Sequence, residues 1–139
     1  MARFLVDTNI CIYIAKQKPP QVLARFQKLS PGAVAMSIVT WGELMFGAAK
    51  SRAPDRSREV LFQLAELIPV LAISVGVGEH YGAIRAALER IGRPVGNNDL
   101  WLAAHAIGEG LTLVTNDEKE FARVPGLKVV NWVDPPAKP

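Results

Sequence analysis

The stretch Phe4-Leu5-Val6-Asp7-Thr8-Asn9 decides the fold, because a short apolar run ends abruptly in polar residues. Such a run, bounded on both sides by polar residues, predicts a strand that is buried on both faces. A similar pattern returns near the other end of the chain, where the run 112–115 leads into Asn116 and Asp117. The sequence therefore predicts two buried strands, each followed by an aspartate.

Amphipathic helical patterns and further short strands fill the chain between and around these two. The expected strands are 3–6, 33–36, 71–73, 112–115 and 128–132, and the expected helices are 10–16, 20–29, 37–50, 60–68, 79–91, 99–107 and 118–123. Alternating strands and helices predict an α/β fold, a three-layer α/β/α sandwich with a mostly parallel central sheet. We expect one domain over residues 1–133 and a proline-rich tail over 134–139.

Four acidic residues stand at positions where this fold would bring them together. Asp7 and Asp117 follow strands, Asp99 opens a helix, and Glu43 lies on a helical stripe with small residues one turn to either side. In parallel sheets of this kind, ligands gather beyond the carboxyl ends of the strands. Crowded carboxylates repel one another and need a hard divalent cation, which proteins commonly use in phosphate chemistry. We therefore take Asp7, Glu43, Asp99 and Asp117 as candidate metal ligands and catalytic residues.

Each aspartate also has an ordinary structural interpretation. Asp7 could form an Asx-turn, Asp99 could complement a helix dipole, and Asp117 could cap the helix after it. Polar neighbours could hold the carboxylates by hydrogen bonds or simply form turns; they are Thr8, Asn9, Thr115 and Asn116. For Glu118 and Glu120 we favour solvated helix positions.

Composition limits the classes of function. The 139 residues carry a net charge of +3, which permits an anionic partner, and basic residues near the acids are candidate phosphate contacts; these are Lys50, Arg52 and Arg93. The single cysteine, Cys11, the lack of an apolar run of about 18 residues and the lack of signal-peptide features predict a cytoplasmic location. The histidines, His80 and His105, are too scattered for a zinc motif.

Four segments in this order resemble the PIN domain, and specifically the VapC-like toxin ribonucleases of bacterial toxin–antitoxin pairs. The segments are Leu5-Val6-Asp7-Thr8-Asn9, Ser37-Ile38-Val39-Thr40-Trp41-Gly42-Glu43-Leu44, Asn98-Asp99-Leu100-Trp101 with the Ala-rich turn after it, and Thr115-Asn116-Asp117 followed by Phe121. The resemblance extends from Phe4 to about Trp132. Each segment alone is a weak signal, whereas the four in order are specific.

The resemblance implies an endoribonuclease that depends on Mg²⁺ or Mn²⁺, with the four acids matching the family's acidic quartet. It also implies an RNA substrate, a small antitoxin protein, a homodimer and no membrane association. The expected reaction is hydrolysis by a metal-activated water. The alternatives are a PIN-like nuclease in RNA processing or acting on DNA, and a non-catalytic RNA-binding module.

Overall fold

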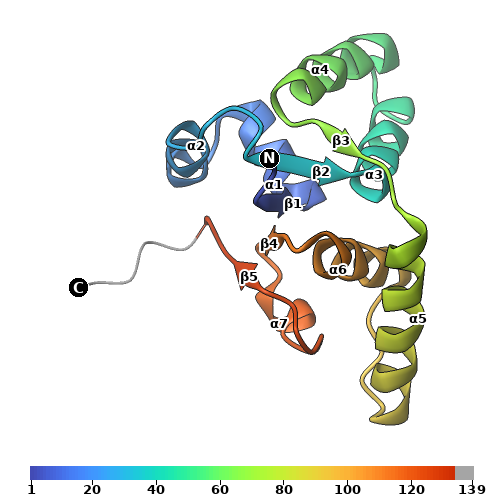
Figure 1. Ribbon diagram of the computed structural model, residues 1–139. Helices are drawn as coiled ribbons and strands as arrows, with labels where there is room; N and C mark the ends of the chain where they lie inside the picture. The colour runs from blue at the N-terminus through green and yellow to red at the C-terminus, as the bar shows by residue number, and fades with distance from the viewer. Residues whose placement is uncertain (134–139) are drawn as a thin grey trace.

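The computed structural model describes residues 1–133, so the predicted tail over 134–139 lies outside the described residues (Figure 1). In chain order the elements are β1 (Phe4–Val6), α1 (Thr8–Lys16), α2 (Pro20–Gln27), β2 (Val34–Ser37), α3 (Ile38–Ala49), α4 (Pro54–Leu67), β3 (Val70–Leu71), α5 (Val75–Arg90), α6 (Asn97–Glu109), β4 (Thr112–Val114), α7 (Glu118–Phe121) and β5 (Val129–Val130).

The strands form one sheet in the order β3-β2-β1-β4-β5, and every pair is parallel. In the register, Phe4 of β1 faces Val34 of β2 on one side and Thr112 of β4 on the other. β1 is therefore the central strand, and the carboxyl ends of all five strands point the same way (Figure 1). The predicted α/β class and parallel sheet are confirmed.

Side chains that alternate along the central strands supply two separate cores. Val6 and Val114 belong to a cluster with apolar residues of α1 to α4, while Leu5 and Leu113 belong to a cluster with α5, α6 and α7. Helices thus cover both faces of the sheet, as the continuous apolar character of β1 and β4 requires. The result is the predicted α/β/α sandwich.

Several helices begin earlier than the sequence indicated. The fifth helix starts at Val75 rather than residue 79, because Val77 is fully buried although two glycines flank it. The sixth starts at Asn97, so Asp99 lies within its first turn rather than at its first position. The polar stretch before residue 60 is also helical from Pro54 onward. In the described part of the chain, no helix combines the length and the apolar character needed to cross a membrane.

Candidate metal and nuclease site

Asp7 is held rigidly at the carboxyl end of β1. It caps α1, with one carboxylate oxygen accepting from the Ile10 amide at 3.0 Å and the other accepting from the Thr115 hydroxyl at 2.5 Å. Thr115 follows β4, the neighbouring strand, and is fully buried. Burial raises the pKa of Asp7, and the nearby charges of Glu43 and Asp117 raise it further. The Asx-type cap and a role in a charged site are therefore compatible in the same residue.

Glu43 reaches the same edge of the sheet from α3. The helix begins directly after β2, where the Ser37 hydroxyl accepts from the Val39 amide at 3.1 Å and caps it. One turn and a half later, Glu43 is half-buried and accepts a hydrogen bond from the Thr8 hydroxyl at 3.0 Å. Thr8 is the residue after Asp7, so this bond joins α3 to the end of β1. The geometry explains how a mid-helix glutamate joins residues from strand ends.

Three further carboxylates complete the acidic site. Asp99, Asp117 and Glu120 each offer an oxygen, and these oxygens lie within 4.8 Å of one another. The pKa of Asp99 rises to about 6, first because the residue is partly buried and then because of the charges of Glu120, Glu43, Asp117 and Asp7. The charges of the other four acids thus all act on Asp99. Asp117 makes no capping hydrogen bond with its side chain, which removes the capping interpretation.

Glu120 is the residue of this site that we did not expect from the sequence. Its interpretation as a solvated helix residue is wrong, because it is half-buried and one oxygen accepts from the Gly96 amide at 3.0 Å. The helix α7 has four residues, too few to show an amphipathic pattern. The available signal was the spacing of three from Asp117, which places both side chains on one face of a helical turn. Glu118, in contrast, is exposed and accepts from the Asn131 amide at 2.9 Å.

The four polar neighbours that we singled out divide into two pairs. Thr8 and Thr115 each donate a hydrogen bond to an acid of the site. Asn116 instead accepts from the Asn131 amide at 3.2 Å, and Asn9 is exposed on α1 with no hydrogen bond from its side chain within residues 1–133. The hydroxyl pair therefore orients carboxylates, whereas the asparagine pair does not.

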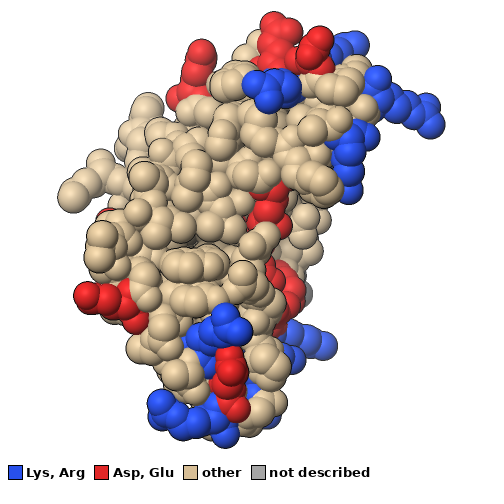
Figure 2. Space-filling model, turned by 90° about the vertical axis from the view of Figure 1, so that its right-hand side faces the viewer, with Lys and Arg blue, Asp and Glu red and all other residues tan. Residues whose placement is uncertain are grey.

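A broad groove opens beside the acids. A cavity of about 700 Å³ is lined by residues of α1, α3 and α6 that include Thr8, Glu43, Lys50 and Asn98. The Lys50 ammonium lies 4.7 Å from the centre of the Phe46 ring at its rim. Figure 2 shows acidic side chains near the right-hand edge of the face, between basic groups above and below. Arg52 and Arg93 are exposed on the loops before α4 and α6 and do not line this cavity.

The donor set fits a hard divalent cation. Carboxylate oxygens are the ligands that Mg²⁺ and Mn²⁺ prefer, and at least three of them lie close enough to share one ion. Burial first, and then the charges of neighbouring acids, raise the pKa of Asp99 and Asp7, so a negative charge on either carboxyl is unfavourable without a cation. A bound cation would relieve this repulsion, and phosphate esters are the substrates that such sites commonly serve.

Comparisons with known proteins agree with this geometry. The family model of the PIN domain matches residues 4–127. The tRNA(fMet)-specific endonuclease VapC of Shigella flexneri is 45% identical over 132 residues, which cover 95% of this chain and 99% of that protein. Ribonuclease VapC2 of Haemophilus influenzae is 39% identical over 133 residues, 96% of this chain and 100% of that protein.

Solved structures give the same result. The DNA-bound VapBC structure from Salmonella typhimurium superposes with a TM-score of 0.89 at 40% identity and covers 95% of this chain and 99% of that one. VapBC-1 from nontypeable Haemophilus influenzae superposes with a TM-score of 0.88 at 36% identity, over 94% and 98% of the two chains. The chain therefore belongs to the PIN-domain family and, within it, to the VapC ribonucleases.

Proposed function

We propose that the protein is a metal-dependent endoribonuclease that acts as the toxin of a toxin–antitoxin pair. The observation that carries this proposal is the convergence of five carboxylates, from four separate parts of the chain, onto one edge of the sheet. Such an arrangement destabilises the fold unless it binds a cation, so its presence indicates a function. The likeness to nucleases over almost the whole chain supports RNA as the substrate class.

In this proposal Asp7, Glu43, Asp99 and Asp117 hold Mg²⁺ or Mn²⁺, and Glu120 joins them. A bound divalent ion supplies an acidified water and offsets negative charge on the phosphoryl oxygens. The two hydrogen bonds to Asp7 fix its carboxylate, so it needs no reorganisation during the reaction. Thr8 donates a hydrogen bond to one oxygen of Glu43. The other Glu43 oxygen has no hydrogen-bond partner within residues 1–133 and can orient or deprotonate the attacking water.

The products expected from this chemistry are a 5′-phosphate and a 3′-hydroxyl. The metal-independent route through the 2′-hydroxyl needs a pair of acid–base side chains, for which histidine is the usual choice. His105 is unsuited to that task, because it is fully buried with Nδ1 2.8 Å from the Ser37 hydroxyl. Burial also lowers its pKa, which keeps it neutral. Direct hydrolysis is therefore the reaction that the site supports.

The surface next to the acids suits a protein partner. A largely apolar groove of about 470 Å³ runs between α1, α3 and α4, and its lining includes Ile12, Val60 and Leu64 as well as Thr8 and Glu43. A segment lying there would cover the acidic site. Several solved relatives are VapBC complexes, which supports a small antitoxin as the occupant.

We further propose a homodimer in the cytoplasm. The face formed by α3, α4 and α5 has a broad middle zone with almost no charged side chains (Figure 2). Apolar side chains at the starts of α3 and α5 are exposed, with Ile38 at 43% and Val75 at 88% of full exposure. A second copy of the chain would bury this zone. The free cysteine is buried, in keeping with a reducing compartment.

The direct test uses purified protein freed of any partner. It is incubated with total cellular RNA in the presence of Mg²⁺, Mn²⁺ or EDTA, alongside an Asp7→Asn variant. A matched control is Asp55→Asn, which removes an exposed acid from the first turn of α4. We expect discrete fragments with 5′-phosphates that require metal, appear with the Asp55 control and vanish with Asp7→Asn. Intact RNA under all conditions, or equal cutting by the Asp7 variant, would contradict the proposal.

A further inference from the structure

A third cavity, separate from the two that Glu43 lines, lies between α5 and the loop that leads into α6. Its volume is about 440 Å³, and apolar side chains form part of its lining, namely Leu88, Pro94, Val95 and Leu100. The rest of the lining is polar or charged: Arg85 and Glu89 come from α5 and Asn97 from α6, so the walls are of mixed character. A concave site that combines apolar walls with a few placed polar groups is a common arrangement for binding a small ligand.

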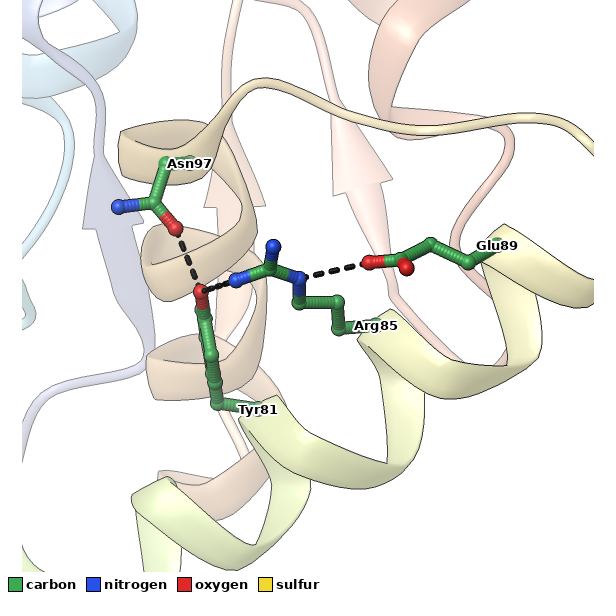
Figure 3. Close-up of polar contacts among 4 residues, drawn as sticks. All are labelled: Tyr81, Arg85, Glu89 and Asn97. Atoms are coloured by element: carbon green, nitrogen blue, oxygen red, sulfur yellow. Dashed lines mark hydrogen bonds and ion pairs between the residues drawn. The ribbon is translucent and has the colours of Figure 1, made fainter.

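The polar side chains are held in place before any ligand arrives (Figure 3). The Tyr81 hydroxyl donates to the Asn97 side-chain oxygen and accepts from Arg85 at 2.9 Å. Glu89 accepts from the other side of the Arg85 guanidinium at 2.7 Å. The Tyr81 ring in turn stacks on Trp101 of α6, with the ring centres 3.9 Å apart and the planes 14° apart. The chain of contacts fixes Arg85 although its side chain is 55% exposed.

Hydrogen-bond donors remain free after these contacts are made. The contacts to Tyr81 and Glu89 use one terminal nitrogen and Nε of Arg85, and the other terminal nitrogen has no partner within residues 1–133. The side-chain amide nitrogen of Asn97 likewise has none within that range. Glu89 neutralises the charge of Arg85, so the pair suits hydrogen bonds to a neutral group better than attraction of a bare phosphate. Nucleobases offer such acceptors at their edges, and guanidinium planes stack on their faces.

The cavity lies next to the acidic site. Asn97 and Leu100, which line it, share the first turn of α6 with Asp99, whose side chain points to another face of the helix. Gly96, just before that turn, lies against the Asp99 and Glu120 carboxylates. The loop that forms one wall is bonded to an acid of the site, because the Gly96 amide donates to Glu120 at 3.0 Å. Arg123 donates to the carbonyl of Pro94 at 3.1 Å and fixes the same loop from α7. A nucleotide in the cavity would therefore neighbour a phosphate at the acids.

We propose that this cavity is a base-recognition subsite, in which Arg85 and Asn97 contact a nucleobase beside the phosphodiester that is cut. The subsite rests on the proposed ribonuclease function and adds sequence preference to it. RNA in single strands or loops presents unstacked bases that can enter such a cavity. Tyr81 is a positioning residue in this account, since it acts through the two side chains that it orients.

The test measures base preference rather than total activity. Short single-stranded RNAs carry each of the four bases at the positions flanking the mapped cut, and kcat/KM is measured for each. For Arg85→Gln we expect the ratio between the best and worst base to fall about tenfold, the scale of one good base contact. Tyr81→Phe, which keeps the stacking ring, should lose part of the preference. The control Arg90→Gln removes an exposed charge from the last turn of α5 and should keep it.

Two further measurements separate the possible failures. Affinity for Mn²⁺ should be the same in Arg85→Gln and the wild type. A lower Mn²⁺ affinity in Arg85→Gln, or an equal decrease in kcat/KM for every RNA, would show that Arg85 only stabilises the position of α6. Either result would overturn the subsite. If the wild type cuts no RNA, the ribonuclease proposal fails by itself. Base preference is then measured as binding anisotropy in an Asp7→Asn background, where an unchanged preference on adding Arg85→Gln would overturn the subsite independently.

Discussion

Replacing Asp99 with asparagine should stabilise the metal-free protein while abolishing its activity. Partial burial, and then the charges of four other acids, raise the pKa of the Asp99 carboxyl, so in the absence of a cation its charge opposes folding. Asparagine has nearly the same shape and carries no charge. The substitution therefore removes the cost of a partly buried charge and of its repulsion by the other acids, at the expense of activity, which is a common relation between stability and activity.

The magnitude follows from the pKa of Asp99, which rises from 3.8 to about 6. Each pKa unit corresponds to about 1.4 kcal/mol, so the full effect above pH 7 would be about 3 kcal/mol. Because Asp99 is only partly buried, solvent screening reduces the expected gain to roughly 1 to 2 kcal/mol. For a chain of this size that corresponds to an increase in Tm of about 3 to 8 °C.

The pH dependence of the stability difference between Asp99→Asn and the wild type tests whether the Asp99 charge causes it. A carboxyl whose pKa is raised on folding destabilises the protein above that pKa, and the cost vanishes as pH falls through about 6 toward 3.8. The advantage of Asp99→Asn over the wild type should therefore shrink between pH 8 and pH 5. Taking the difference between the two proteins cancels contributions from groups that do not interact with Asp99, such as His105.

The assay is urea unfolding in EDTA at pH 8 and pH 5, followed by circular dichroism, with Asp55→Asn as the control. Cleavage of RNA in Mn²⁺ is measured on the same preparations, and we expect the Asp99 variant to lose at least about a hundredfold. An Asp99→Asn protein that is no more stable than the wild type at pH 8 would refute the electrostatic reasoning. An advantage that stays constant with pH would refute it equally.

Three other predictions concern the same region. Thr115→Val should lower the free energy of unfolding by about 1.5 to 3 kcal/mol in urea denaturation, because it removes a hydrogen bond to the buried Asp7 carboxylate. Thr115→Ser keeps the hydroxyl and should therefore retain most of the wild-type stability. A Ser variant as unstable as the Val variant would count against this hydrogen bond. In urea unfolding, the stability advantage of the wild type over His105→Gln should shrink as pH falls below 6.5. Burial lowers the pKa of His105, so its protonation opposes folding. An advantage that grows on acidification would be the contrary result. Mn²⁺ at a hundredfold excess over its Kd should stabilise the wild type by about 2.7 kcal/mol in thermal unfolding and leave Asp99→Asn nearly unchanged, whereas equal stabilisation would place the ion elsewhere.

The sequence alone predicted the location of those acids that follow a strand, because the topology of a parallel sheet determines where strand ends meet. Asp7 and Asp117 follow strands, and in a parallel sheet with β1 beside β4 they had to meet at one edge. The stripe around Glu43 was visible because α3 has 12 residues, enough to show a helical period.

Other features depended on tertiary contacts that no local pattern records. Glu120 lies on a helix of four residues, and its position follows from the bond to Gly96 on a distant loop. The cavity at Arg85 likewise arises only when α5 packs beside the loop before α6. The spacing of the histidines argued against a zinc motif, and the structure shows that His105 is instead a buried residue in contact with Ser37.

The central claim is that the carboxylates bind a divalent cation, and the most direct measurement is anomalous diffraction from crystals of the protein soaked in Mn²⁺. The account predicts a strong anomalous peak within coordination distance, about 2.1 to 2.3 Å, of oxygens from Asp99, Asp117 and Glu120 or Asp7. The peak should disappear in crystals of Asp99→Asn. A well-ordered site with no peak, or a peak confined to other residues, would contradict the claim and the ribonuclease mechanism built on it.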